Sequence, residues 1–118
     1  MKTWAIVTFQ FEGIHKWEAP LKEVEFLGNP HRHIFYVTIK IEQFHDNRDI
    51  EYILFKRKMS LDMSKLTDCG TMSCEQLAKK FVHAAVQTYP NRDMIVKVME
   101  DNENGAIVEH KGSDSTSL

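Results

Sequence analysis

The sequence has 118 residues, of which 42% are hydrophobic and 27% are charged, and its formal net charge is −2. A chain of this size and composition suits one globular domain with its own hydrophobic core. The near-neutral charge argues against a protein that binds nucleic acid or an anionic membrane surface.

The N-terminal residues, the apolar stretches and the cysteines indicate the cellular compartment that we expect. The first residues show no apolar run followed by small residues, so we expect no signal peptide. The sequence has no apolar stretch long enough to span a bilayer. Cys69 and Cys74 are the only cysteines, which is too few for a disulfide framework. These features favour a cytoplasmic protein with reduced thiols.

Two segments in the first half of the chain alternate between apolar and polar residues, as half-buried strands do. The first runs from Thr3 to about Glu12, and the second runs from His31 to Phe44. Residues 16–30 between them contain two prolines and one glycine. This composition predicts a loop with at most a short helical turn.

Helical spacing replaces the alternation in the middle of the chain. Residues 46–49 break the second strand and can open a helix. The apolar residues that follow at helical intervals are Ile50, Ile53 and Leu54, with Phe55 and Met59 beside them.

A second helix is expected after a loop at residues 60–72. Ser73 is a suitable N-cap, and Gln76 completes a capping box. The helix should end before Pro90. Its expected buried stripe consists of Leu77, Phe81, Ala84 and Ala85.

Alternation returns near the C-terminus, from Met94 to Glu100. Residues 101–105 predict a turn, with Asn104-Gly105 as the hairpin signal before a short strand at 106–109. The last residues, 111–118, are small and polar, which predicts a disordered tail.

The elements predict a single α+β domain over residues 1–110, in the order β-β-α-α-β-β. We expect an antiparallel four-stranded sheet with two helices on one face. Four strands leave two exposed edges unless they pair with other copies, which favours a homo-oligomer.

Three histidines lie at the ends of the two expected strands. His31 and His33 are two residues apart, so both side chains leave one face of the strand, with Cα atoms roughly 6–7 Å apart. His15 has the parity of the apolar side of its strand and reaches the same face if the two strands pair. Three imidazoles with one open position are typical of a catalytic zinc site. The alternative is that they are partly buried residues of the sheet that hold no metal.

Five short motifs along nearly the whole chain carry a family resemblance. They are Phe9-x-Phe11-x-x-x-His15, His31-Arg32-His33, Glu51-Tyr52-x-x-Phe55-Lys56, Ser73-Cys74-Glu75-Gln76-Leu77-Ala78-Lys79 and Val96-Lys97-Val98-Met99-Glu100. In this order they resemble the motifs of the 6-pyruvoyl-tetrahydropterin synthase and 6-carboxytetrahydropterin synthase superfamily. The resemblance implies the tunnelling fold, in which the sheets of several copies, as a trimer or hexamer, join into a barrel.

The resemblance also implies a function. Zinc on the three histidines would act as a Lewis acid toward a dihydroneopterin-type substrate in pterin or 7-deazapurine (queuosine-type) biosynthesis. Glu100 would accept hydrogen bonds from the amino group and ring N–H of the heterocycle, with Ser73 and Cys74 near the pterin of a neighbouring subunit. Without the resemblance, Glu100 is a solvated strand end and Ser73 is a helix cap.

The sequence departs from the family pattern at the catalytic residues. Active members carry a cysteine four residues before the first histidine of the pair, where this chain has Leu27. A variant branch carries a glutamate where this chain has Gly28. Glu25 and Cys74 are the candidate catalytic replacements.

The family's aspartate–histidine pair between the two helices also has no counterpart. The acids in that region, Asp62 and Asp68, have no adjacent histidine. Three hypotheses remain: a zinc-dependent lyase of this family, a non-catalytic zinc protein that binds a pterin or nucleotide, and a structural oligomer.

Overall fold

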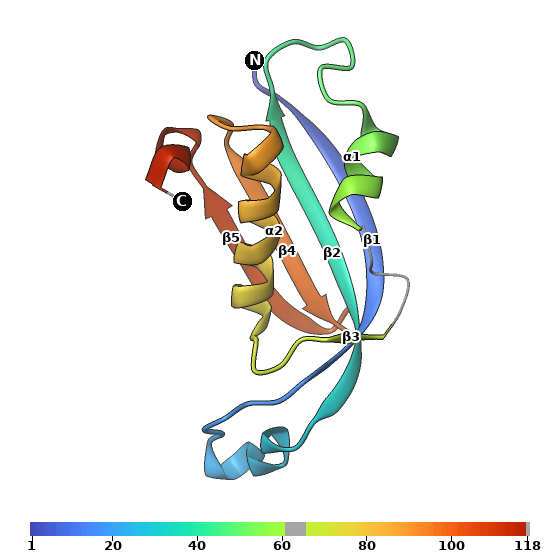
Figure 1. Cartoon of the computed structure of the whole chain (residues 1–118), viewed down its shortest axis with the longest axis vertical. Coiled ribbons are helices and arrows are strands. Elements are labelled where there is room, and N and C mark those ends of the chain that lie inside the picture. Colours follow the sequence, from blue (N-terminus) through green and yellow to red (C-terminus); the bar gives the residue numbers. More distant parts are fainter. Residues whose placement is uncertain (61–65, 118) are drawn as a thin grey trace.

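The computed structural model describes residues 1–60 and 66–117, and it is a mixed α+β structure built on one five-stranded sheet (Figure 1). Its strands are β1 (Thr3–His15), β2 (His31–Gln43), β3 (Thr67–Asp68), β4 (Met94–Glu100) and β5 (Asn104–His110). In space they follow the order β3-β1-β2-β4-β5. Neighbouring strands are antiparallel except β3, which runs parallel to β1.

The prediction of four strands is therefore wrong, because the sheet has a fifth strand. The additional strand, β3, lies between the two helices in the chain, within the expected loop at residues 60–72. It has two residues, which is too short for alternation to mark it in the sequence. Among the described residues the sheet is open, with β3 and β5 at its edges, so one chain forms no closed barrel.

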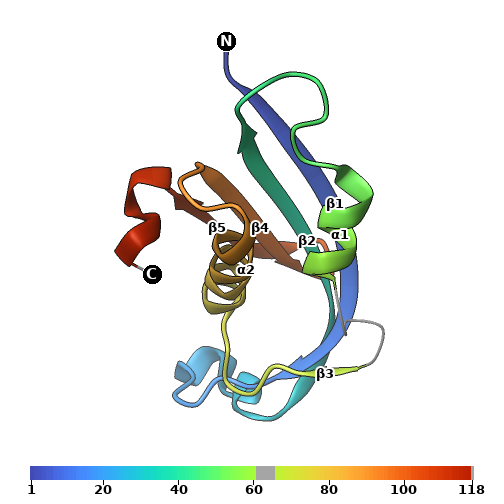
Figure 2. The same ribbon diagram turned by 45° about the horizontal axis from the view of Figure 1, so that its top comes forward.

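Two α-helices cover one face of the sheet, as Figures 1 and 2 show. Helix α1 (Tyr52–Met59) packs against β1, and α2 (Cys74–Thr88) packs against β4 and β5. Two 3₁₀ helices lie outside this layer, η1 (Lys22–Gly28) and η2 (Gly112–Ser117). Within residues 1–60 and 66–117, no helix has both the length and the apolar character that a membrane span requires.

The core lies between the sheet and these helices. Every second residue of the long strands is buried there, which is the physical origin of the alternation in the sequence. The buried strand residues include Ala5, Val7 and Phe11 of β1, Phe35, Val37, Ile39 and Ile41 of β2, and Met94, Val96 and Val98 of β4. Because His15, His31, His33 and Glu100 have the same parity as these residues, their side chains leave the same face.

The capping box of α2 is confirmed. The Ser73 hydroxyl accepts a hydrogen bond from the Gln76 N–H, and the Gln76 side chain accepts one from the Ser73 N–H. Most of the predicted stripe is buried, but Ala84 is exposed.

The predicted pattern of α1 is partly wrong. Phe55 and Met59 are buried, whereas Ile53 and Leu54 are exposed. A short helix that rests on the sheet along one line buries residues four apart and leaves the flanking positions in solvent.

The turn between β4 and β5 differs from its prediction. Asp101 and Asn102, with φ of 52° and 59°, are the turn residues, and the Glu103 N–H donates to the Glu100 carbonyl. Gly105 was expected in this turn but lies in β5, opposite Met99. Glycine is required there because a Cβ atom would collide with backbone atoms of β4.

The C-terminal segment, expected to be a disordered tail, contains η2. The Ser115 hydroxyl accepts a hydrogen bond from the Asn91 N–H and lies 3.0 Å from Nε2 of His110. Hydrophobicity patterns do not reveal such polar contacts between distant segments.

Asp49 links the β2–α1 connection to the α2–β4 connection, at the end of the sheet away from the histidines. Its Oδ2 atom accepts hydrogen bonds from the Phe44 N–H and from Nη1 of Arg92, each 2.7 Å long. The Arg92 Nη1 atom also donates to the Glu42 carbonyl. Hydrogen bonds from Arg92 and from the Phe44 N–H lower the pKa of Asp49 below its usual value.

Replacing Asp49 with asparagine should lower the free energy of unfolding by about 1.5–3 kcal/mol at neutral pH, the usual range for hydrogen bonds to charged groups. Because the folded-state pKa is lowered, the carboxylate stabilises the fold above about pH 4 and loses this effect as pH falls through the lowered value. Urea unfolding should therefore show the difference between the two proteins narrowing in acid. Asp46→Asn, an exposed change in the same loop, is the control. Equal free energies of unfolding at neutral pH, or a difference that does not shrink in acid, would contradict this stabilising role of the Asp49 carboxylate.

Candidate metal centre

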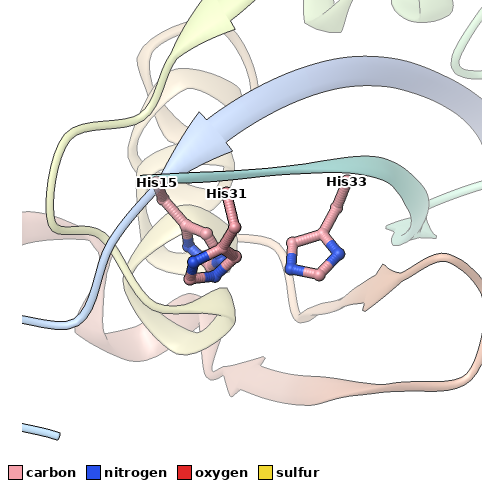
Figure 3. Close-up of side chains that lie close together, drawn as sticks. All are labelled: His15, His31 and His33. Atoms are coloured by element: carbon pink, nitrogen blue, oxygen red, sulfur yellow. The ribbon is translucent and has the colours of Figure 1, made fainter. Parts of the chain in front are cut away.

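The pairing of β1 and β2 brings the three histidines together. His15 is directly opposite His31 in the antiparallel register, and His33 is opposite Gly13. Figure 3 shows all three imidazoles on the same side of the two strands. One ring nitrogen from each residue lies within 4.8 Å of the others. The three predicted ligands are therefore close enough to hold one metal ion.

Each imidazole is held through its Nδ1 atom. In His15 this atom lies 2.7 Å from the Met72 carbonyl oxygen, and in His31 it lies 2.8 Å from the Asn29 carbonyl oxygen. A carbonyl oxygen only accepts, so both Nδ1 atoms carry the proton. In a neutral ring this leaves Nε2 with its lone pair available to a metal.

The third imidazole is held by a carboxylate. Nδ1 of His33 lies 2.6 Å from Oδ2 of Asp101, and Oδ1 of Asp101 accepts a hydrogen bond from the Ile34 N–H. These two hydrogen bonds lower the pKa of Asp101 below its usual value. A histidine that ligates a metal commonly donates its other N–H to a carboxylate or carbonyl in this way, which orients the ring and makes it a better ligand.

The Nε2 atoms are the unusual feature. Those of His15 and His33 are buried, and neither has a hydrogen-bond partner among the described residues. His15 itself is only 7% exposed. Buried polar atoms without partners are costly and rare in native structures, and an ion is one of the groups that satisfies them. This property fits a metal ion better than it fits histidines that only fill space in the sheet.

Phe35 forms one wall of the cluster. Its ring lies edge-on to the rings of His15 and His33, with centroid distances of 5.3 and 5.7 Å. Gly13 leaves the space for this ring, because a Cβ atom on Gly13 would approach Phe35 Cε2 to 2.7 Å.

A cavity of about 440 Å³ opens beside the histidines. Of the residues predicted to bind substrate, all three line it: Glu100, Ser73 and Cys74. Glu25 is exposed on η1 and lines a different hollow of the surface. Asp68 accepts a hydrogen bond from the Gly70 N–H, and Asp62 lies outside the described residues.

The Cys74 thiol is poorly suited to react by itself. Its Sγ atom donates to Oε1 of Glu100 over 3.5 Å. Burial, followed by the negative charge of Glu100, raises the pKa of Cys74 to about 12. The thiol is therefore protonated at neutral pH, whereas a nucleophile or base would need to be a thiolate.

The residues that orient the three imidazoles could not be predicted from the sequence. Asn29 and Met72 act through their backbone carbonyls, which every residue has, and Asp101 was predicted only as part of a turn. Its position directly after Glu100 was the one sign that it lies near the histidines.

We expect protein stripped of metal to take up one zinc or cobalt ion per chain, because the three imidazoles converge on one point. Replacing any one of them with alanine should abolish stoichiometric binding in elemental analysis. His83→Ala, an exposed change on α2, is the matched control and should bind normally. Wild-type protein without metal uptake would rule out the centre.

Replacing Asp101 with asparagine should weaken metal binding by about 10- to 100-fold, the usual effect of removing a group that holds a ligand. Asparagine keeps an acceptor for the Ile34 N–H and tolerates the positive φ, so the turn should persist. Chelator competition measures the change. Glu103→Gln removes an exposed charge from the same turn and should have no effect. Equal losses of metal affinity in the two variants would show that the loss comes from removing a negative charge and not from the contact with His33.

Comparison with known proteins does not assign the chain to a family. No protein-family model matches the sequence. A search of curated proteins also found no match. Functional inference therefore depends on the geometry of this centre and its cavity.

Proposed function

We propose that this chain is a zinc-dependent protein of the 6-pyruvoyl/6-carboxytetrahydropterin synthase type that binds a dihydroneopterin-type heterocycle. The observation that carries the proposal is the convergence of three imidazoles beside a cavity lined by Glu100. When bound, zinc would supply a Lewis acid on the side of the cavity where the substrate lies.

The chemistry of the cavity supports a heterocycle that offers two hydrogen-bond donors. Glu100 provides two carboxylate oxygens that can pair with the amino group and adjacent ring N–H of a pterin. Trp17, Leu27 and Met72 give the same cavity apolar surface for a flat ring. A ligand without these donors would leave a half-buried carboxylate unpaired, which disfavours it.

A second candidate is a protein that binds the heterocycle without converting it. Leu27 lines the cavity where active members of the family have a cysteine, and an aliphatic side chain cannot transfer a proton. Cys74 is protonated at neutral pH because of its raised pKa. Loss of general acid–base groups typically lowers the rate by about 10²–10⁴-fold for each group.

Assembly into a trimer or hexamer is part of the proposal. The sheet has two open edges, β3 and β5. Large apolar side chains are exposed on β1, β5 and α1, namely Ile6, Ile107, Tyr52, Ile53 and Leu54. Pairing between copies would satisfy the edges and cover part of this apolar surface.

Zinc-loaded protein should bind a dihydropterin in calorimetry and should bind lumazine about 10- to 100-fold more weakly, because lumazine lacks the amino group that pairs with Glu100. Glu75→Gln changes an exposed carboxylate in the same cavity and should keep this preference. Equal affinity for the two compounds, or no binding of either, would refute the proposed ligand class.

Turnover separates the two candidates. Dihydroneopterin triphosphate incubated with the zinc-loaded protein should yield new fluorescent pterin products if the chain is an enzyme. Stoichiometric binding without product would identify the non-catalytic candidate.

A further inference from the structure

Glu100 lies closer to the metal centre than a residue that only anchors a heterocycle needs to lie. Its Oε2 atom is 3.1 Å from Nε2 of His33, and its Oε1 atom is 3.7 Å from Nε2 of His15. We propose that Glu100 is the fourth ligand of this centre while no heterocycle is bound. The site is then a closed set of three imidazoles and one carboxylate.

Strand geometry delivers Glu100 to the histidines. It is the last residue of β4 and has the parity of the buried residues of that strand. In the register of β2 and β4 it lies opposite Phe35, two residues along β2 from His33. The carboxylate and the imidazoles therefore extend from neighbouring strands over the same face of the sheet.

The distances from Glu100 to two of the three imidazoles are close to those between ligands of one ion. Nitrogen and oxygen ligands about 2.0–2.1 Å from a tetrahedral zinc ion lie about 3.4 Å from each other. Each carboxylate oxygen lies near that distance from one imidazole, 3.1 Å for Oε2 and His33 and 3.7 Å for Oε1 and His15. Neither Nε2 atom forms a hydrogen bond with the carboxylate, although that of His33 is within hydrogen-bonding distance of Oε2. These nitrogen and oxygen atoms are therefore close together without a hydrogen bond between them.

The local charges favour a cation at this place. With Nδ1 protonated, each Nε2 atom presents a lone pair beside the negative carboxylate. Among the described residues, the Glu100 carboxylate lies beside the imidazoles of His15 and His33 and accepts a hydrogen bond from the Cys74 thiol. A metal ion between these groups would remove the repulsion among their lone pairs.

Cys74 has a positioning role in this arrangement. Its thiol donates to Oε1 of Glu100, and Oε2 is the oxygen that lies nearer to His33. The thiol thus orients the carboxylate with one oxygen directed toward the ligand cluster.

Heterocycle binding would then compete with the metal for Glu100. A pterin that pairs with both carboxylate oxygens would use lone pairs of the group that holds the ion and would weaken its ligation. This second step rests on the proposed function, whereas ligation by Glu100 does not.

Cobalt(II) substitution tests whether Glu100 is a ligand, because the visible absorption of cobalt depends on its ligand set. Metal-free wild-type, Glu100→Gln and Glu75→Gln proteins are titrated with cobalt, and zinc affinity is measured by chelator competition. Glu100→Gln should shift the spectrum and weaken zinc binding on the order of 100-fold or more, beyond the loss expected for Asp101→Asn. Glu75→Gln should match the wild type. Circular dichroism of the metal-free proteins checks that they fold, and Glu100→Ala replaces Glu100→Gln if the latter does not.

A variant of Glu100 with the wild-type spectrum and zinc affinity would overturn the ligand assignment, whether or not a pterin binds. A changed spectrum with no pterin binding would retain the ligand and refute the proposed function. Addition of a dihydropterin to wild-type cobalt protein should shift the spectrum toward that of Glu100→Gln. Pterin binding that leaves the spectrum unchanged would overturn the competition for Glu100.

Discussion

The antiparallel register of β1 and β2 is the constraint on which the candidate site depends. It places His15 directly opposite His31 and keeps His33 on the same face. A slip of one residue would turn one strand's side chains to the other face of the sheet and separate the imidazoles. The register is held by the core, because Phe11, Phe35 and their neighbours must also point toward the helices. The same hydrophobic packing that stabilises the fold therefore assembles the histidine cluster.

The surroundings of the cluster determine what it can bind. Two backbone carbonyls and the Asp101 carboxylate each hold an Nδ1 atom, so the Nε2 atoms are directed at one another. The buried Nε2 atoms of His15 and His33 have no hydrogen-bond partner among the described residues, and a cation between the rings would satisfy them. The polar contacts around the rings thus suit the cluster to a metal ion, and Phe35 packs edge-on against the rings of His15 and His33.

Glu100 and Cys74 connect the metal centre to its cavity. The carboxylate lines the cavity beside the imidazoles, and the thiol donates to it. The charge of Glu100 also contributes to the raised pKa of Cys74, which keeps that thiol protonated. A thiol in this setting is poorly suited to transfer a proton at neutral pH.

The sequence alone determined the long strands, the second helix with its capping box and the three histidines that meet in the candidate centre, because period-two alternation and side-chain parity are local properties. It also placed Glu100 on the face of β4 that bears Val96 and Val98. Only the tertiary structure decided the pairing of β3 with β1, the position of the β4–β5 turn at Asp101 and the contacts of the Nδ1 atoms. These depend on which segments meet in space and on single backbone atoms, and neither leaves a periodic signal along the chain.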